Sequence, residues 1–324
     1  LVRDWVTGID LDARRLDLHR GDPIGFDKLL IATGSQSNRF GWPGQDLDGV
    51  QGLYDLMDLR KLYDNCRDTR HAVIVGGGLI GIELAEMLHS RNIHVTFLVR
   101  ESSYWNNVLP SEESAIINRI IGKAGIELRL ETELAEIVDD GTGRASGVVT
   151  NHGDRIDCQI VGLTAGVRPN IGLAQGTAID TGRGILADWS LRTNVPEIYV
   201  AGDCAEIVNE GETRNLIQQV WYTGKMQGRL VAETMAGRET RYDPGIWYNS
   251  AKFLDLEYQT YGRVNMRVPG EENIYWEHPN GLHALRLVTV DDRLIGVNGM
   301  GRRSRHRVCE RWGAGARPLA NCPT

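Results

Sequence analysis

Apolar and polar positions follow their most regular pattern between residues 71 and 99. Residues 71–75 form an apolar, β-rich run, a glycine-rich turn follows, and residues 82–90 have the apolar spacing of a helix. A second β-rich run covers residues 93–99. This order of strand, helix and strand predicts one βαβ unit.

Weaker patterns of the same kind predict the other elements. Helical spacing predicts helices at residues 55–67, at residues 111–123 with Ser111 as the N-cap, and from about residue 216 to residue 236. Apolar runs and alternation predict strands at residues 1–6, 15–18, 26–34, 126–130, 133–138, 147–150, 158–163, 254–261, 284–290 and 294–297. The strands at residues 126–163 are expected to complete or flank the sheet of the βαβ unit, and residues 313–324 are expected to be disordered.

The length of the chain bounds the number of domains. A chain of 324 residues exceeds the size at which one hydrophobic core usually stops growing, so we expect two or three domains. Changes of pattern place boundaries near residues 45, 163 and 243, with a β-rich segment after the last of them.

Composition and charge exclude several classes of protein. Hydrophobic residues make up 41% and charged residues 24%, which excludes a disordered chain. The net charge of −7 argues against nucleic acid or an anionic membrane as a partner. The basic run at residues 302–307 is interpreted as a solvated face, with a nucleotide or partner contact as the alternative. No apolar stretch reaches the roughly 18 residues of a membrane span.

The first residues and the cysteines indicate whether the chain carries a targeting peptide and in which compartment it lies. The chain starts at Leu1 with neither an initiator Met nor an apolar signal core, so we expect a missing N-terminal portion and no targeting peptide. The five cysteines form no CxxC pair and no metal-like spacing. We therefore expect reduced thiols, no metal site and a cytoplasmic location.

The glycine-rich turn fits the GxGxxG pattern of dinucleotide-binding βαβ units. Gly76 would make the tight turn, Gly78 would let a pyrophosphate approach the backbone, and Gly81 would let the helix pack closely on the sheet. The alternative is a glycine turn that binds no nucleotide. The residues predicted to hold the pyrophosphate are Gly76, Gly77, Gly78, Leu79, Ile80 and Gly81.

The end of the second strand predicts which nicotinamide cofactor binds. An acidic side chain there would accept hydrogen bonds from the adenosine ribose of NADH and repel a 2′-phosphate. Val99 stands at this position and Arg100 follows it, which favours NADPH over NADH. Glu101 leaves NADH open, because an error of one residue in the predicted end of the strand would place an acidic side chain near the ribose. The alternative for Arg100 is a solvated loop residue that binds no cofactor.

Four motifs in order carry a resemblance to a known family. They are LLIATGS at residues 29–35, VIVGGGLIGIELA at 73–85, GVRPN at 166–170 and LRTNVPEIYVAGDCA at 191–205. Together they resemble the pyridine nucleotide-disulfide oxidoreductase-like flavoproteins, in the branch of CoA-disulfide reductases, NADH oxidases and ferredoxin reductases.

The resemblance implies an α/β fold with two Rossmann-like dinucleotide-binding domains. An FAD domain, incomplete at its N-terminus, would cover residues 1–45 and 164–243, interrupted by an NAD(P) domain at residues 46–163. Residues 244–324 would form a partial α+β interface domain, and a homodimer is left open.

The resemblance also implies roles for single residues. Asp203 would bind the ribityl chain of FAD, with an N-cap role alone as the alternative, and Glu83 would lie near the nicotinamide and flavin as the catalytic residue, with a salt bridge or a helix-dipole contact as the alternative. The remaining cofactor-binding residues implied by the motifs are Thr33, Gly34, Gly166 and Gly202.

Three features of the family pattern are missing. The sequence shows no N-terminal GxGxxG unit, no redox cysteine after it, and no HxxxxE pair of the glutathione reductase type. Cys66 and Cys204 are interpreted as bystanders, so we expect no disulfide chemistry through a cysteine of this chain.

The function implied is that of an FAD-dependent NAD(P)H oxidoreductase. Hydride would pass from NADPH, or NADH, to the flavin and onward to a disulfide, dioxygen or a redox protein. The alternative is a catalytically silent NAD(P)H-binding protein with an incomplete FAD half.

Overall fold

The computed structural model describes residues 1–309, and its internal contacts divide the chain into two compact units. The first unit comprises residues 1–36 and 167–244, and the second comprises residues 37–166 and those from 245 onward. Each unit has buried cores of its own. The predicted disorder of residues 313–324 lies outside the described residues.

A parallel five-stranded sheet forms the centre of the second unit. Its strand order is β6-β13-β7-β8-β9. The strands are β6 (Val50–Gln51), β13 (Ile160–Leu163), β7 (His71–Val75), β8 (His94–Leu98) and β9 (Glu127–Arg129). After their first residues, β7 and β8 are buried along their whole length rather than at every second residue, and β13 is buried throughout, because helices and a second layer cover both faces of the sheet.

Helices connect these parallel strands. They are α1 (Leu56–Asn65), followed by the short 3-10 helix η1 (Cys66–Asp68), then α2 (Leu79–His89) and α3 (Ser111–Lys123). Asp55 caps α1 by accepting hydrogen bonds from the amides of Met57 and Asp58. The predicted N-cap of α3 is wrong: extended Pro110 is the cap residue and Ser111 is the first helical residue, so the Ser111 side chain does not cap the helix.

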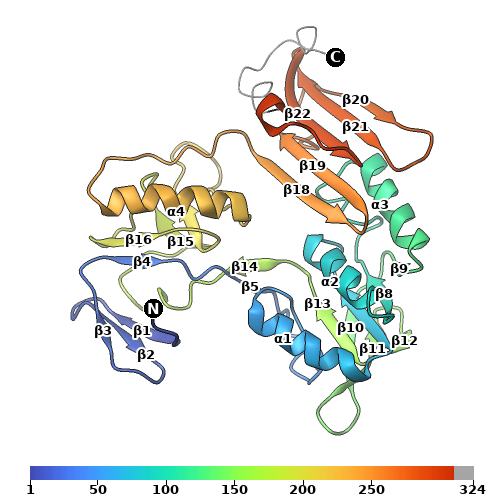
Figure 1. The fold of residues 1–324 in the computed structure, drawn as a ribbon, viewed down its shortest axis with the longest axis horizontal. Helices are drawn as coiled ribbons and strands as arrows, with labels where there is room; N and C mark the ends of the chain where they lie inside the picture. The colour runs from blue at the N-terminus through green and yellow to red at the C-terminus, as the bar shows by residue number, and fades with distance from the viewer. Residues whose placement is uncertain (310–324) are drawn as a thin grey trace. The chain divides into compact units, whose positions relative to one another are not determined.

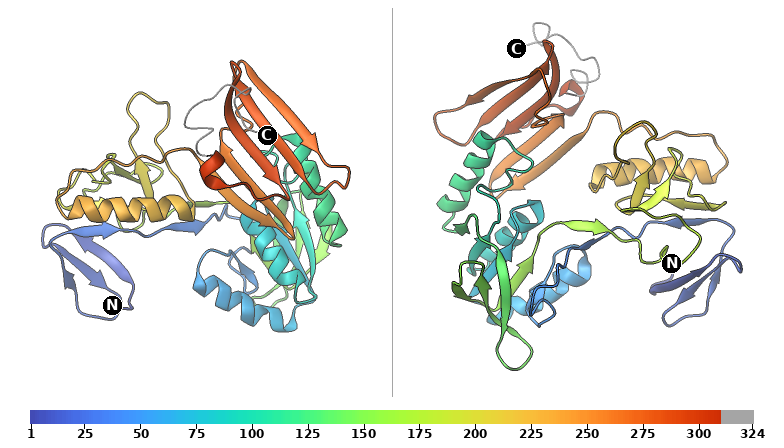
Figure 2. Two further views of the ribbon diagram at one scale, coloured as in Figure 1. Left: turned by 45° about the horizontal axis from the view of Figure 1, so that its top comes forward. Right: turned by 180° about the vertical axis from the view of Figure 1, so that it is seen from behind.

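Two antiparallel sheets complete the second unit. The strands β10 (Leu134–Asp139), β11 (Ala145–Thr150) and β12 (Arg155–Asp157) pair next to the parallel sheet as a separate meander. The C-terminal sheet has the order β18-β19-β22-β21-β20. Figure 2 shows this sheet in orange to red. Its strands are β18 (Tyr248–Phe253), β19 (Leu256–Gly262), β20 (Glu271–Glu277), β21 (Ala284–Val290) and β22 (Arg293–Met300).

One hydrophobic core joins the C-terminal sheet to the helices of the parallel sheet. Phe253 and Met300 of the C-terminal sheet belong to the same buried cluster as Ile82 of α2 and Ile116 of α3. In Figure 1, β18 runs past α2. The β-rich C-terminal segment therefore depends for its stability on the βαβ region.

A buried ion pair fixes α3 to the same sheet. The Arg286 guanidinium on β21 donates to both carboxylate oxygens of Glu113, at 2.7 and 2.8 Å, and to Glu112 at 2.7 Å. The Arg286 and Glu113 side chains are only 5% and 1% exposed. The guanidinium also lies over the ring of Tyr275, 4.8 Å from its centroid. A buried pair of this kind fixes the register of two elements because neither charge can be left alone.

Small sheets and one long helix make up the first unit. The antiparallel sheet β1-β2-β3 consists of β1 (Val6–Asp10), β2 (Arg15–Leu18) and β3 (Ile24–Gly25). Parallel pairs join β4 (Leu29–Ile31) to β16 (Ile198–Val200) and β15 (Ile185–Ala187) to β17 (Ala205–Ile207), and α4 (Trp221–Met235) packs on β16. The strand β5 (Ser35–Ser37) pairs with β14 (Val167–Pro169).

Two predicted elements of the first unit are wrong in position. The strand predicted at residues 1–6 lies instead at Val6–Asp10, where the pairing with β2 supplies the hydrogen bonds. The helix predicted from about residue 216 begins only at Trp221, because Leu216 is held by a bridge to Ile207. Among residues 1–309, no helix combines the length and apolarity that crossing a bilayer requires.

We expect Glu113→Ala to lower the free energy of unfolding by about 3–5 kcal/mol, because it leaves the Arg286 charge buried without its partner. Urea unfolding followed by circular dichroism measures this value. The matched control is Arg119→Ala, which removes the exposed ion pair of Arg119 with Glu277 between the same helix and sheet and should cost about 1 kcal/mol or less. Equal losses in the two variants would contradict the structural role given to the buried pair.

Candidate functional site

A cavity of about 480 Å³ opens where the parallel strands of the second unit end. The carboxyl ends of adjacent parallel strands are the usual place for ligands in α/β sheets. The lining residues come from β7 and its glycine turn, from the ends of β8 and β13, and from loops of the same unit. They are Phe40, Trp42, Val75, Gly76, Gly77, Gly78, Leu98, Arg100, Glu101, Trp105, Asn107, Thr132, Glu133, Leu134, Thr164, Ala165 and Gly166.

Two glycines of the turn have no room for a side chain. Gly76 has a φ of +116°, and a Cβ there would lie 2.7 Å from the carbonyl oxygen of Thr164. A Cβ at Gly81 would lie 2.9 Å from both the Gly76 oxygen and the Thr164 hydroxyl. These glycines take the turn-forming and close-packing places that the motif predicts for them.

The end of the turn, at Gly78, is open toward the cavity. A Cβ at Gly78 would meet no atom within 4 Å, and Gly78 is the N-cap of α2 without any side chain that caps the helix. The first amides of α2, those of Leu79 and Ile80, are therefore left for a ligand at the positive end of the helix dipole. This uncapped glycine start fits a pyrophosphate group, which supplies the acceptor oxygens that a capping side chain would otherwise provide.

The residues after β8 differ in where their side chains lie. Val99 is fully buried and packs beneath Gly77, with 2.9 Å between the Val99 Cγ1 and a Cβ built on Gly77. No carboxylate therefore stands directly after β8. Arg100 and Glu101 both line the cavity and form an ion pair of 3.0 Å, in which the arginine side chain is 72% exposed and the glutamate 28%.

Glu83 lies on α2 outside the cavity lining. Glu83 is exposed to solvent within the second unit. Desolvation by the surrounding protein, and next the Glu86 carboxylate, raise the pKa of Glu83 above the ordinary value of a glutamate. The role near the nicotinamide that the resemblance implies stays a prediction. Gly166, with a φ of +83°, lines the cavity as the last residue of the segment after β13.

The residues predicted to hold FAD gather in the first unit. The Thr33 hydroxyl donates to the Asn170 carbonyl at 2.6 Å, and the Asn170 amide donates to the carbonyl of Gly34 at 2.8 Å. These bonds tie the end of β4 to the GVRPN segment, so two of the four motifs meet. Gly34 adopts a positive φ of +69°, as a tight turn after a strand requires.

Asp203 accepts a hydrogen bond from a hydroxyl group. The Ser35 Oγ donates to Asp203 Oδ2 at 3.1 Å, and Gln219 Nε2 donates to Ser35 Oγ at 2.8 Å. The alternative reading of Asp203 as a helix N-cap is wrong, because β17 follows it and Val220 is the N-cap of α4. Gly202, with a φ of +82° and no atom within 4 Å of a Cβ, leaves the backbone beside Asp203 open.

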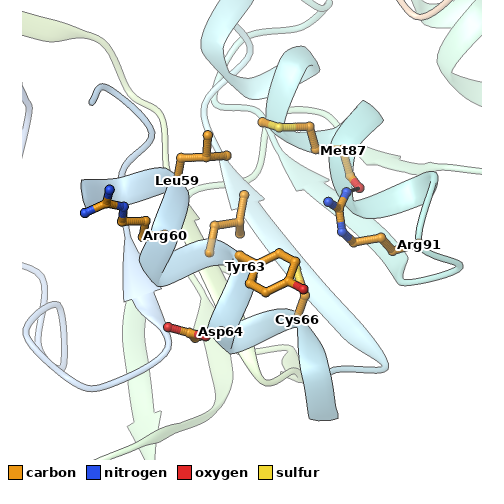
Figure 3. Close-up of a pocket in the computed structure, with 8 residues that line it drawn as sticks. Leu59, Arg60, Tyr63, Asp64, Cys66, Met87 and Arg91 are labelled. Carbon is orange, nitrogen blue, oxygen red and sulfur yellow. Dashed lines mark hydrogen bonds between the residues drawn. The ribbon is translucent and has the colours of Figure 1, made fainter. Parts of the chain in front are cut away.

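A second hollow, of about 500 Å³, lies between α1 and α2. Figure 3 shows Leu59 and Tyr63 of α1 facing Met87 and Arg91 across it, with Cys66 at the end of the helix. Burial raises the pKa of the Cys66 thiol, and Arg91 only partly offsets this. The hollow has no glycine turn and no uncapped helix start, so the glycine-lined cavity is the better candidate site.

The other described cysteines are also unsuited to act as thiolates. Cys204 is fully buried, 3.7 Å from the carbonyl oxygen of Ile31, and burial raises the pKa of Cys158 to about 12. Burial raises the pKa of Cys309 as well. Residues 1–309 contain no cluster of His, Cys, Asp or Glu that could hold a metal ion.

The sequence patterns did not single out Thr164 or four aromatic residues at or behind the cavity. Thr164 directly follows β13, and the rule that sites lie at strand ends could have found it. The others are aromatic residues of loops, which follow no periodic pattern and carry no motif: Phe40, Trp42, Tyr104 and Trp105.

Comparisons with known proteins agree with this geometry. The family described as pyridine nucleotide-disulphide oxidoreductase matches residues 1–228. The biphenyl dioxygenase system ferredoxin–NAD(+) reductase component from Paraburkholderia xenovorans is 30% identical over 231 residues, which cover 71% of this chain and 56% of that protein. Rhodocoxin reductase from Rhodococcus erythropolis is 28% identical over 317 residues, 97% of this chain and 72% of that protein.

A solved structure extends the match to the fold. The crystal structure of a ferredoxin reductase from Rhodopseudomonas palustris has a TM-score of 0.84 and 25% sequence identity, and the match covers 95% of this chain and 75% of that one. The predicted α/β fold class is confirmed. The chain spans little more than half of the first relative's length.

We expect Gly78→Val to abolish nicotinamide dinucleotide binding while leaving unfolding cooperative. The structure has space for the side chain, but the valine methyls would fill the place where a pyrophosphate approaches the backbone. Fluorescence titration with NADPH and NADH measures the loss. Gly122→Val is the control, since that glycine also has open space but lies on the exposed side of α3. Binding by the Gly78 variant as tight as that of the parent would show that the turn is structural only.

Proposed function

The chain belongs to the pyridine nucleotide-disulphide oxidoreductase family, and from this premise we propose that it oxidises NAD(P)H and delivers the electrons to a small redox protein. The four sequence motifs predicted the family, and the family match confirms that prediction. The observation that carries the proposal is the uncapped glycine start of α2 at the floor of the cavity, which fits a dinucleotide pyrophosphate.

We assign FAD to the first unit. Asp203 already accepts a hydroxyl donor, which is the chemistry of a ribityl or ribose contact, and the open backbone at Gly202 leaves room beside it. Thr33 and Gly34 would lie against the flavin nucleotide. When bound, a flavin takes up hydride from a nicotinamide and gives up electrons singly, and the residues of this chain position the two rings and exclude water. Glu83 is proposed to stand at the reacting end of the nicotinamide.

A redox protein is the acceptor that the observations favour. Disulfide reduction through this chain requires a thiolate, and the described thiols are buried or have raised pKa values. The relatives named above are reductases of ferredoxin and of rhodocoxin. The alternative of a silent NAD(P)H-binding protein has no support from relatives that are all named as reductases.

The proposal is tested on the purified full chain. We expect the flavin released from the protein to show an absorbance band at about 450 nm. We also expect oxidation of NAD(P)H with ferricyanide or a [2Fe–2S] ferredoxin as the electron acceptor. Activity should survive alkylation of all accessible thiols. A colourless preparation that binds NADPH would favour the silent alternative, and loss of activity in step with modification of one cysteine would identify a catalytic thiol.

We propose NADPH as the preferred donor. Val99 places no carboxylate after β8, and the exposed Arg100 guanidinium on the cavity wall can pair with a 2′-phosphate. The Glu101 carboxylate already pairs with Arg100, so a 2′-phosphate would have to compete with it. Relatives with NAD(+) in their names make the opposite choice the direct alternative.

Arg100→Ala should weaken NADPH binding by about 1–3 kcal/mol and leave NADH binding nearly unchanged, because only NADPH carries the charged group that the arginine would hold. Dissociation constants for both cofactors measure this difference. Glu101→Gln is the matched control: it removes the competing carboxylate and should tighten NADPH. Equal losses for both cofactors, or a wild type that binds NADH better, would overturn the preference but not the proposed oxidation of NAD(P)H.

A further inference from the structure

We propose that Tyr104 is a positioning residue for dinucleotide binding, which acts by fixing the Gly78–Leu79 peptide from behind the glycine turn. This inference rests on the proposed function, since it concerns how the same cavity holds the pyrophosphate of NAD(P)H. Tyr104 does not line the cavity and no motif includes it.

The Tyr104 hydroxyl reaches the backbone of the turn directly. Its Oη donates to the carbonyl oxygen of Gly78 at 2.8 Å, and the side chain is fully buried. The same hydroxyl lies 3.2 Å from a Cβ built on Gly81, so the third glycine of the motif makes room for the tyrosine as well as for the strand.

Tyr104 is itself held at several points. Its backbone amide donates to Asn118 Oδ1 at 3.0 Å, and its carbonyl accepts from the Ser114 hydroxyl at 2.7 Å, so both bonds come from α3. Its ring packs edge-on against Phe97 of β8, with centroids 5.3 Å apart and planes at 76°. A side chain with these constraints places its hydroxyl at one fixed point.

The geometry of a peptide bond transmits this constraint to the cavity. The Gly78 carbonyl and the Leu79 amide belong to one planar trans unit, so their oxygen and hydrogen point in opposite directions. Since Tyr104 holds the oxygen on the protein side, the Leu79 N–H is turned to the open side of the helix start. The Ile82 amide also donates to the Gly78 oxygen, at 3.3 Å, as the first bond of α2. Glycine has no side chain to restrict this peptide, so the tyrosine adds a second and shorter hydrogen bond that holds it.

The Tyr104 hydroxyl is protonated, and so remains a donor, at neutral pH. Burial raises the pKa of Tyr104 well above its ordinary value. A neutral hydroxyl in an apolar site needs one acceptor, and the Gly78 carbonyl is that acceptor.

Tyr104→Phe tests the inference, because it keeps the ring and removes only the hydroxyl. We expect KM for NADPH to rise about fivefold to tenfold, as for loss of one buried hydrogen bond, with kcat and the KM of the electron acceptor unchanged. Inhibition by adenosine 2′-monophosphate, which has no 5′-phosphate, should not change, because the effect acts on the pyrophosphate contact.

Tyr258→Phe is the matched control. Tyr258 belongs to the same buried cluster and is 2% exposed, and its hydroxyl bonds to Thr260 rather than to the glycine turn. It should lose a similar amount of thermal stability with no change in the KM for NADPH. Where Tyr104→Phe does not fold, Ser114→Ala, which removes the bond to the Tyr104 carbonyl, should raise the same KM to a smaller extent.

The outcomes separate this inference from the function on which it rests. An unchanged KM for NADPH in Tyr104→Phe, an equal rise in Tyr258→Phe, or equal weakening of adenosine 2′-monophosphate would overturn the positioning role alone. A wild type that binds neither NADPH nor NADH would overturn the proposed function together with it.

Discussion

The close approach of α2 to the ends of β7 and β13 is the constraint on which the second unit depends. A Cβ at Gly76 or Gly81 would collide with the Thr164 segment or with the turn itself. Only this approach places the helix start at the carboxyl edge of the sheet, where strand ends, loops and a positive helix terminus meet. The cavity is therefore a result of backbone packing, and the side chains around it adjust its selectivity.

A series of contacts holds the glycine turn in place. Tyr104 touches the turn, and α3 holds Tyr104 through Ser114 and Asn118. The buried pair of Glu113 and Arg286 then fixes α3 to the C-terminal sheet. A segment distant in sequence thus contributes to the rigidity of the glycine turn without reaching it, because each contact is at least partly buried and has one favourable geometry.

Sequence patterns predicted the elements that local physics determines. The bounds of β7, α3, β2 and β21 agree with the predicted ranges, because each is a continuous apolar or amphipathic run between clear turn signals. The start of α4 was predicted too early, since Leu216 forms a bridge to Ile207 at the end of β17 instead of joining the helix. β20 was missed because it is an edge strand with mostly exposed positions, and such strands lack alternation.

The residues of the candidate site also fall into those that the sequence predicted and those that it could not. The motif predicted Gly76 and Gly81 correctly, because a positive φ at Gly76 and close contacts at both positions exclude other residues, whereas Gly78 has open space. The sequence placed Val99 at the strand end, but it could not predict that Val99 packs beneath Gly77. The aromatic residues of the cavity could not be predicted, because tertiary structure alone brings them there. For Asp203 the structure removes only the alternative of a helix N-cap, because the strand β17 follows it, and the contact with FAD stays a prediction.

The start of α2 has a thermodynamic consequence. A helix whose N-cap is glycine and whose first amides have no side-chain acceptor is incomplete as a folding unit, and a dinucleotide phosphate would complete it. Binding and folding are then linked functions: ligand that binds only the folded chain adds RT ln(1 + [L]/Kd) to its stability, about 2.7 kcal/mol at a hundredfold excess over Kd. A bound dinucleotide would therefore also lengthen the lifetime of the folded chain against proteolysis.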